Sequence, residues 1–225
     1  MGLFESLKDR CSPAWVDYTE HEFVEQLGRG TLPTAVFQAY LVQDFHFLVQ
    51  FARATALAAF KSRTLADITA AHAATGAILA ETELHLRLTE RWGIPRAQLE
   101  AAPEKQATVA YTRYVLDCGM SGDLLDLHVA LIPCVIGYGE IAKALAPNGP
   151  DALGDHPYRE WIGEYAGEGY LAAAAGARAN LDRLAARGVS EERFAELVKI
   201  FAMASRLEAG FWQMGLDLGA EAKVA

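Results

Sequence analysis

One mostly apolar stretch, residues 122–143 (GDLLDLHVALIPCVIGYGEIAK), constrains the fold more than any other part of the chain. The stretch is helix-like, but Pro133 lies in its middle. A proline inside a helix cannot donate a hydrogen bond to the carbonyl one turn back, here that of Val129, and its ring crowds that carbonyl. The sequence therefore predicts a helix that kinks or loosens just before Cys134.

Cys134 and Tyr138 are four residues apart in this stretch, so a helix places them on one face. A thiol beside a phenol in apolar surroundings is a candidate site. The alternative is a buried cysteine that packs as a small hydrophobic residue, with a tyrosine beside it. Most buried cysteines are structural, so this stretch alone leaves both interpretations open.

Helical signals continue along the rest of the chain. Apolar residues recur at helical spacing in residues 32–62, and Thr64 with Asp67 resembles a capping box. No segment shows the sustained alternation of a strand, and glycines and prolines separate the segments. Helices are expected over residues 3–10, 12–27, 32–62, 64–92, 104–120, 122–143, 157–165, a continuation to 187, and 190–214. We therefore expect an all-α fold, a single-domain helical bundle that spans residues 1–225.

Composition excludes several classes of protein. The net charge is −9 and the pI about 5.2, which argues against nucleic acid or an anionic membrane surface as a partner. Cys11, Cys118 and Cys134 form no CxxC pair, and their odd number does not suit a disulfide framework. The first residues do not resemble a signal peptide, and no run of about 18 apolar residues indicates a membrane span. We expect a cytoplasmic protein.

Two carboxylates fall on apolar helix faces. Asp44 shares a face with Tyr40 and Phe47, and Glu208 lies close to Phe211. A carboxylate in such a position is costly unless it is paired, so each is a candidate for function. The alternatives are a structural ion pair or helix-to-helix hydrogen bond for Asp44, and a place at the helix edge for Glu208.

Tyrosines recur at helical spacing. Tyr111 and Tyr114 are three residues apart, and Tyr158, Trp161 and Tyr165 follow on a later helix. Aromatic stripes of this kind belong more often to a core than to a site. A buried tyrosine nevertheless needs a partner for its hydroxyl, and several together suggest a pocket with aromatic walls for a flat heteroaromatic ligand.

The histidines do not match a metal site. A carboxylate-bridged di-iron bundle needs Glu-x-x-His pairs on two helices, whereas the nearest spacings are Glu81 to His85 and Asp126 to His128. The sequence also lacks a P-loop, a GxSxG motif and a glycine-rich dinucleotide turn. We expect no metal and no cofactor. Four histidines are assigned structural or solvent-exposed roles: His21, His72, His85 and His128.

Four segments resemble the TenA (thiaminase II) family of the haem-oxygenase-like superfold, in that family's order and spacing. They are YLVQDFHF (40–47), YTRYVLDCGMSGDLLDLHVALIPCVIGYGEIAK (111–143), YREWIGEYAGEGY (158–170) and RLEAGFWQM (206–214). The resemblance implies an aminopyrimidine aminohydrolase of thiamine salvage. Such enzymes convert 4-amino-5-aminomethyl-2-methylpyrimidine to the hydroxymethylpyrimidine and ammonia, and many also cleave thiamine. It also implies a homotetramer.

The resemblance carries roles onto individual residues. Cys134, in the P-C-x-x-G-Y motif, is implied to be the nucleophile, which places the chain in the cysteine-bearing branch. Asp44 is implied to hold the ring nitrogen and amino group of the pyrimidine, and Glu208 to be the general acid/base. Apolar surroundings disfavour a thiolate, so Cys134 needs a base, and Glu208 is the candidate.

Further residues are implied to line the ring pocket. Tyr138 lies close to the thiol, Tyr111 and Tyr165 line the ring, and Phe211 stacks nearby. Phe47 is a departure, because many members have tyrosine there and one hydrogen bond in the pocket is lost or supplied by water. Two alternatives stay open: a metal oxidase on the same superfold, and a non-catalytic pyrimidine-binding regulator.

Overall fold

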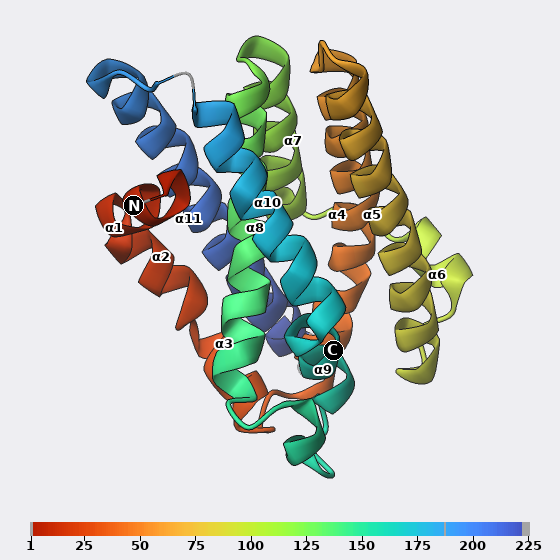
Figure 1. The fold of residues 1–225 in the computed structure, drawn as a ribbon. Helices are drawn as coiled ribbons and strands as arrows, with labels where there is room; N and C mark the ends of the chain where they lie inside the picture. The colour runs from red at the N-terminus through yellow and green to blue at the C-terminus, as the bar shows by residue number, and fades with distance from the viewer. Residues whose placement is uncertain (1, 187, 222–225) are drawn as a thin grey trace. The chain divides into compact units, whose positions relative to one another are not determined.

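The computed structural model describes residues 2–186 and 188–221, and every regular element within those ranges is helical (Figure 1). The prediction of an all-α fold is therefore confirmed. The elements are α1 (Leu3–Arg10), α2 (Ser12–Thr19), α3 (Glu22–Gly28), α4 (Thr34–Lys61), α5 (Leu65–Arg91), α6 (Arg96–Ala101), α7 (Gln106–Ser121), α8 (Leu124–Leu145), the 3-10 helix η1 (Pro150–Leu153), α9 (Arg159–Ala166), α10 (Glu168–Ala185) and α11 (Glu191–Glu221).

The chain divides into two compact units. The first comprises Met1–Leu32 and His128–Ala209, and the second comprises Pro33–Leu127 and Gly210–Ala225. Helices α8 and α11 each pass without interruption from one unit into the other. The expectation of one domain over residues 1–225 stays a prediction.

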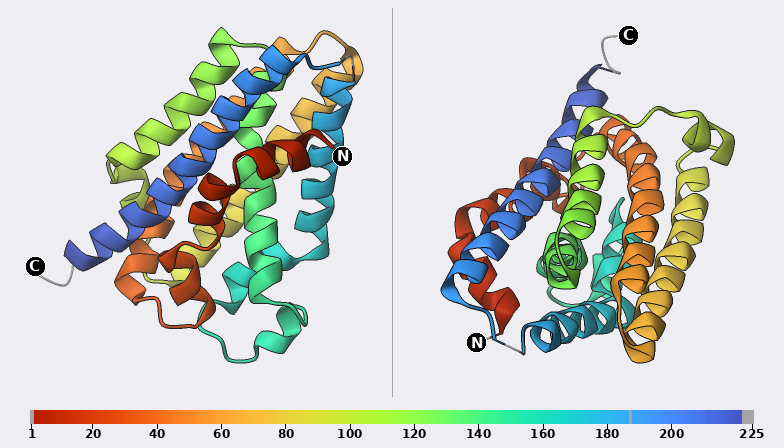
Figure 2. Two further views of the ribbon diagram at one scale, coloured as in Figure 1. Left: turned by 90° about the vertical axis from the view of Figure 1, so that its left-hand side faces the viewer. Right: turned by 90° about the horizontal axis from the view of Figure 1, so that it is seen from above.

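The first unit is built on an aromatic cluster from α1, α2 and α11. Trp15 stacks on Phe201 at 5.5 Å between ring centroids, and its edges meet Phe4 and Tyr18. The N-terminal helices therefore lie along the first half of α11, as the left view of Figure 2 shows. These rings are almost fully buried, and burial of large aromatic side chains is a main source of stability.

The second unit is organised by the paired helices α4 and α5, which run side by side (Figures 1 and 2). The apolar stripe predicted for residues 32–62 is buried as expected, including Phe37, Tyr40 and Phe51. At the start of α5, the Thr64 hydroxyl accepts the Asp67 amide at 3.1 Å, which confirms the capping interaction. Capping satisfies an amide that the helix itself leaves without a partner.

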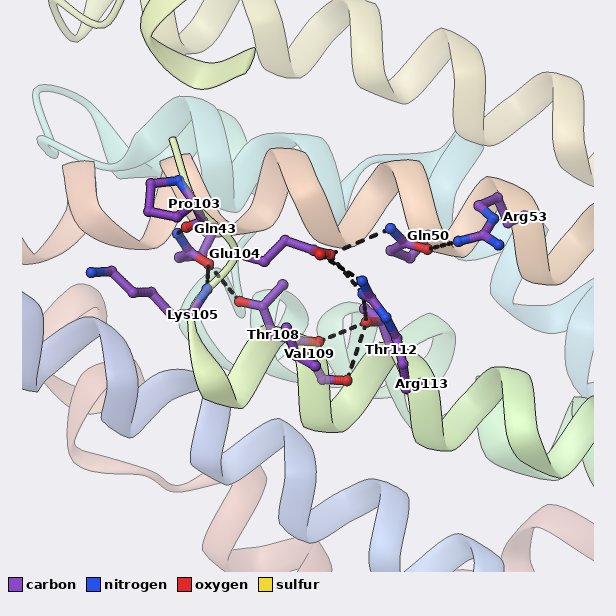
Figure 3. Close-up of polar contacts among 10 residues, drawn as sticks. All are labelled: Gln43, Gln50, Arg53, Pro103, Glu104, Lys105, Thr108, Val109, Thr112 and Arg113. Carbon is purple, nitrogen blue, oxygen red and sulfur yellow. Dashed lines mark hydrogen bonds and ion pairs between the residues drawn. The ribbon is translucent and has the colours of Figure 1, made fainter. Parts of the chain in front are cut away.

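Gln43 of α4 fixes where α7 begins (Figure 3). Its buried side-chain amide donates to the Pro103 carbonyl at 3.1 Å. Its carbonyl oxygen accepts the Lys105 amide at 2.8 Å and the Thr108 hydroxyl at 2.7 Å. Lys105 is the N-cap of α7 and provides no side-chain cap, so Gln43 supplies a cap from another helix.

Three helix boundaries differ from those expected. Residues 12–27 form two helices, because the His21 ring accepts the Phe23 amide at 3.2 Å and starts α3 as a new helix. The segment expected to connect two helices, residues 94–103, contains α6. The last helix continues to Glu221 instead of ending near Met214. Helix α8 runs through Pro133, and the kink at that position stays a prediction.

Among the described residues, α8 is the one helix long and apolar enough to cross a membrane. Polar residues interrupt it, so it contains no continuous run of about 18 apolar residues. In its most apolar 18-residue window, 67% of the residues are buried inside the protein, as in the core helix of a soluble protein. The apolar character of α8 is thus accounted for by burial within the fold.

Replacing Gln43 with Ala is expected to destabilise the protein by about 2 kcal/mol, because the buried Thr108 hydroxyl and two partly buried backbone groups lose their partner. Gln50→Ala is the matched control, since the Gln50 amide contacts Glu104 at the less buried end of the same network and should cost about 0.5 kcal/mol. Urea denaturation of both variants measures the difference. Equal stability of the two variants would contradict the capping role.

Candidate functional site

A buried carboxyl forms the polar centre of the second unit. Asp44 of α4 is 4% exposed, and its Oδ2 lies 3.3 Å from Nδ1 of His85 on α5. The Nε2 atom of His85 lies 2.8 Å from the Leu41 carbonyl oxygen. A carbonyl can only accept a hydrogen bond, so Nε2 must carry a proton. Asp44 therefore has the helix-to-helix partner that the sequence left as one of its alternatives.

Burial sets the protonation of this pair. It raises the pKa of the Asp44 carboxyl to about 7, and a hydrogen bond from the Tyr40 hydroxyl opposes part of that rise. It lowers the pKa of His85 to about 4, which the bond to Leu41 opposes. Desolvation disfavours the charged form of both groups. Near neutral pH the Asp44 carboxyl can thus donate as well as accept.

His85 was assigned a structural or solvent-exposed role from the sequence. The structure buries it against Asp44, which agrees with the first of these two alternatives. The spacing to Glu81 on the same helix pointed to an ordinary surface pair. Nothing in the local pattern could reveal a partner on a different helix.

Three of the predicted pocket residues meet in the second unit. Phe47 of α4 lies 5.1 Å from the Tyr111 ring of α7 and 5.7 Å from the Phe211 ring of α11. Tyr40 also contacts Phe211, at 6.1 Å, edge to face. Because all these rings are buried, they form an aromatic wall one turn of α4 away from Asp44.

The thiol and the other predicted tyrosines belong to the first unit. Cys134 is half-buried on α8, one turn before Tyr138. Tyr138 packs edge to face on Tyr165 of α9 at 4.9 Å, and Trp161 lies 5.7 Å from Tyr138. Tyr158, from the same aromatic stripe, donates its hydroxyl to the Leu32 carbonyl and is structural. The residues of this predicted stripe therefore differ in their contacts: Tyr158 bonds the backbone, whereas Tyr165 packs on Tyr138.

Tyr18 of α2 packs against the segment of α8 that carries Cys134. Its hydroxyl lies 3.5 Å from the Pro133 carbonyl oxygen, directly before Cys134. A Cβ atom at Gly137 would come within 2.3 Å of the Tyr18 ring. The glycine of the P-C-x-x-G-Y motif is therefore required in this chain for α2 to reach α8. Sequence reasoning missed Tyr18 entirely.

Glu208 is 1% exposed on α11, three residues before Phe211. The predicted site residues thus divide between the units. Cys134, Tyr138, Tyr165 and Glu208 lie in the first, and Asp44, Phe47, Tyr111 and Phe211 lie in the second. The contacts within each set are those given above, and a common pocket for both sets stays a prediction.

The part of the chain that the structure describes holds no group of three or more His, Cys, Asp and Glu side chains suited to a metal ion. The metal-oxidase alternative therefore finds no ligand set there. All three cysteines lie in that part, and none forms a disulfide.

The arrangement of helices is shared with proteins of very different sequence. A domain from Shewanella denitrificans, with a structure titled as having a heme oxygenase-like fold, superimposes with a TM-score of 0.73 at 13% identity. The match covers 98% of this chain and 94% of that one. The protein therefore has the haem-oxygenase-like helical fold that the resemblance implied.

The family model described as TENA/THI-4/PQQC matches residues 8–218. An aminopyrimidine aminohydrolase of Halalkalibacterium halodurans is 36% identical over 96% of each chain. A structure titled as a TenA family transcription regulator, from Silicibacter sp. TM1040, is 44% identical with a TM-score of 0.88, covering 95% of this chain and 96% of that one. The chain belongs to the TENA/THI-4/PQQC family, as the resemblance indicated.

We compare the free energy of unfolding of the Asp44→Asn variant with that of the unmodified protein at pH 5 and at pH 8. The difference should favour the variant more at pH 8. Because the pKa of Asp44 is raised in the folded protein, its contribution to stability is present near pH 4 and lost as the pH rises through about 7. The relative gain should reach the order of 3 kcal/mol. Chemical denaturation at both pH values measures it, and a gain independent of pH would contradict the raised pKa.

Replacing Gly137 with Ala should destabilise the protein by about 1–3 kcal/mol, because the new methyl group collides with Tyr18. Gly139→Ala is the control on the same helix, where the nearest atom would be at an ordinary 3.4 Å. That change should be neutral or stabilising by up to about 1 kcal/mol. Thermal denaturation of both variants distinguishes them, and equal losses would contradict the close approach of α2.

Proposed function

We propose that this protein is an aminopyrimidine aminohydrolase of thiamine salvage. Its substrate would be 4-amino-5-aminomethyl-2-methylpyrimidine, and its products the hydroxymethylpyrimidine and ammonia. Relatives named aminopyrimidine aminohydrolase, at 29–36% identity, support a hydrolase acting on C–N bonds and a place in thiamine metabolism. Thiamine itself is a second candidate substrate.

The observation that carries the proposal is the buried Asp44 carboxyl with its raised pKa. An aminopyrimidine presents an amino donor beside a ring-nitrogen acceptor. An oxygen of the Asp44 carboxyl can accept a hydrogen bond from the amino group, and also from the ring nitrogen when that nitrogen is protonated. In the same unit, the rings of Phe47, Tyr111 and Phe211 offer flat surfaces for the heteroaromatic ring.

The catalytic step would use the residues of the first unit. The Cys134 sulfur adds to the electron-poor ring, and Glu208 takes the thiol proton and passes it to the departing amine. The bond between the methylene carbon and the amino nitrogen breaks, and ammonia leaves. Water then adds at that methylene carbon and releases a proton. The ring expels the thiolate, which takes up this proton. Asp44 stabilises the charge on the ring throughout.

The other pocket residues would set substrate preference. Tyr138 and Tyr165, which contact each other, would lie beside the thiol and the ring. Phe47 offers no hydroxyl, so a hydrogen bond made by tyrosine in other members would be lost or supplied by water. Preference among pyrimidines should depend on this position.

We also propose a cytoplasmic homotetramer. Its support is an apolar surface at the end of α4 and along α5, where Phe60 is 85% exposed. Leu65, Ile68 and Leu79 are exposed as well and share one face of α5 by helical spacing. Exposed apolar surface of this kind is typical of a protein–protein interface.

A non-catalytic pyrimidine-binding regulator is the second candidate, because the Silicibacter relative is titled a transcription regulator. It would bind the pyrimidine but would tolerate the loss of Cys134 or Glu208. The net charge of −9 does not favour direct contact with DNA, so such a regulator would act through another protein.

Ammonia release from 4-amino-5-aminomethyl-2-methylpyrimidine tests the proposal, with metal-free protein. Steady turnover is expected, and Cys134→Ser should lower it at least a thousandfold, since serine is a far weaker nucleophile. Cys118→Ser, at a buried cysteine of the second unit, should retain most of the activity.

The outcomes separate the candidates. Near-normal turnover by Cys134→Ser would contradict the nucleophile role while leaving the hydrolase in place. Absence of turnover by folded, reduced protein that still binds the hydroxymethylpyrimidine would contradict the hydrolase and favour the regulator.

A further inference from the structure

The two contacts of His85 determine how many protons the buried pair must hold. Leu41 requires a proton on Nε2, so a neutral ring has no proton on Nδ1. An ionised Asp44 would then place its Oδ2 lone pairs 3.3 Å from the lone pair of Nδ1. The contact is attractive only when one proton lies between Nδ1 and Oδ2.

That proton has two positions with the same heavy-atom geometry. On Oδ2 it makes a neutral carboxylic acid that donates to Nδ1, and on Nδ1 it makes an imidazolium that donates to a carboxylate. Burial favours the neutral form. Either way the bond fixes the rotation of the Asp44 carboxyl and does not use its other oxygen, Oδ1.

The other side chains described around Asp44 have different contacts. From α4, the Tyr40 hydroxyl donates to the Asp44 carboxyl but cannot hold His85 in place. From α7 and α11, Tyr111 and Phe211 contact Phe47, one turn further along α4. His85 is the group from α5 that meets the carboxyl, and α5 is the helix that packs along α4.

We infer that His85 is a positioning residue for Asp44: with the Leu41 carbonyl as its anchor, it holds one proton on the pair and aims the carboxyl at an aminopyrimidine. The inference rests on the proposed function for the identity of the ligand. It adds a residue to which neither the resemblance nor the family match gives a role.

The binding test measures the affinity for 4-amino-5-hydroxymethyl-2-methylpyrimidine by calorimetry between pH 5.5 and 8.5. In the unmodified protein the affinity should fall as the pair loses its proton. His85→Asn places an amide donor near the position of Nδ1. This donor stabilises the ionised Asp44 carboxylate without a shared proton, so the pKa of Asp44 falls. The midpoint of that fall should therefore move at least one pH unit lower.

Two further variants serve as controls. His72→Asn makes the same change at an exposed histidine of α5 and should leave the midpoint unchanged. His85→Gln keeps a donor for Leu41 but presents nothing to Asp44, and should weaken binding at pH 6 about tenfold. The titration of the ligand itself is common to all variants. An unchanged midpoint in His85→Asn, even with uniformly weaker binding, would make His85 merely structural and overturn the inference.

A second measurement needs no ligand. Nitrogen NMR of the imidazole should show His85 protonated at Nε2, hydrogen-bonded at Nδ1 and not titrating near pH 6.5, and Asp44→Asn should shift the Nδ1 signal. An Nδ1 signal that Asp44→Asn leaves unchanged would overturn the inference. If the protein binds no pyrimidine at all, the proposed function fails, and the NMR result alone decides the role of His85.

Discussion

The burial of the Asp44 carboxyl is the constraint on which the second unit depends. A carboxyl removed from water is tolerated only when its polar atoms find partners inside the protein. Here α5 provides the His85 ring, and α4 provides both the Tyr40 hydroxyl and the Leu41 carbonyl. The pairing of α4 with α5 therefore does more than bury apolar surface. It also gives the buried Asp44 carboxyl a partner from a second helix.

The neighbouring residue, Gln43, extends the same principle to the next helix. Its buried amide bonds the start of α7, and α7 carries Tyr111 to the aromatic wall. Two adjacent polar side chains on α4 thus hold α5 and α7 in register with one another. Polar groups in a helical core fix geometry in this way only when every member is satisfied. The precision of the candidate ligand surface depends on these two residues.

Local chemistry could be predicted from the sequence, and contacts between distant segments could not. Thr64 and Asp67 are three residues apart, so their capping interaction was readable from the pattern. The break at His21 was missed because histidine is an unusual N-cap. His85 and Tyr18 were missed because their partners are separated from them in sequence and become neighbours only through packing. The candidate residues themselves came from a family resemblance, since spacing alone left structural alternatives open.

The contact between Tyr18 and α8 gives the N-terminal helices an influence that their position in the sequence does not suggest. The Tyr18 hydroxyl meets the carbonyl directly before Cys134, and its ring occupies the space that a side chain at 137 would need. The sizes of the side chains at positions 18 and 137 are therefore coupled. During divergence, a larger residue at one position requires a smaller residue at the other. Substitutions in α2 can thus alter the environment of the thiol while α8 keeps its sequence.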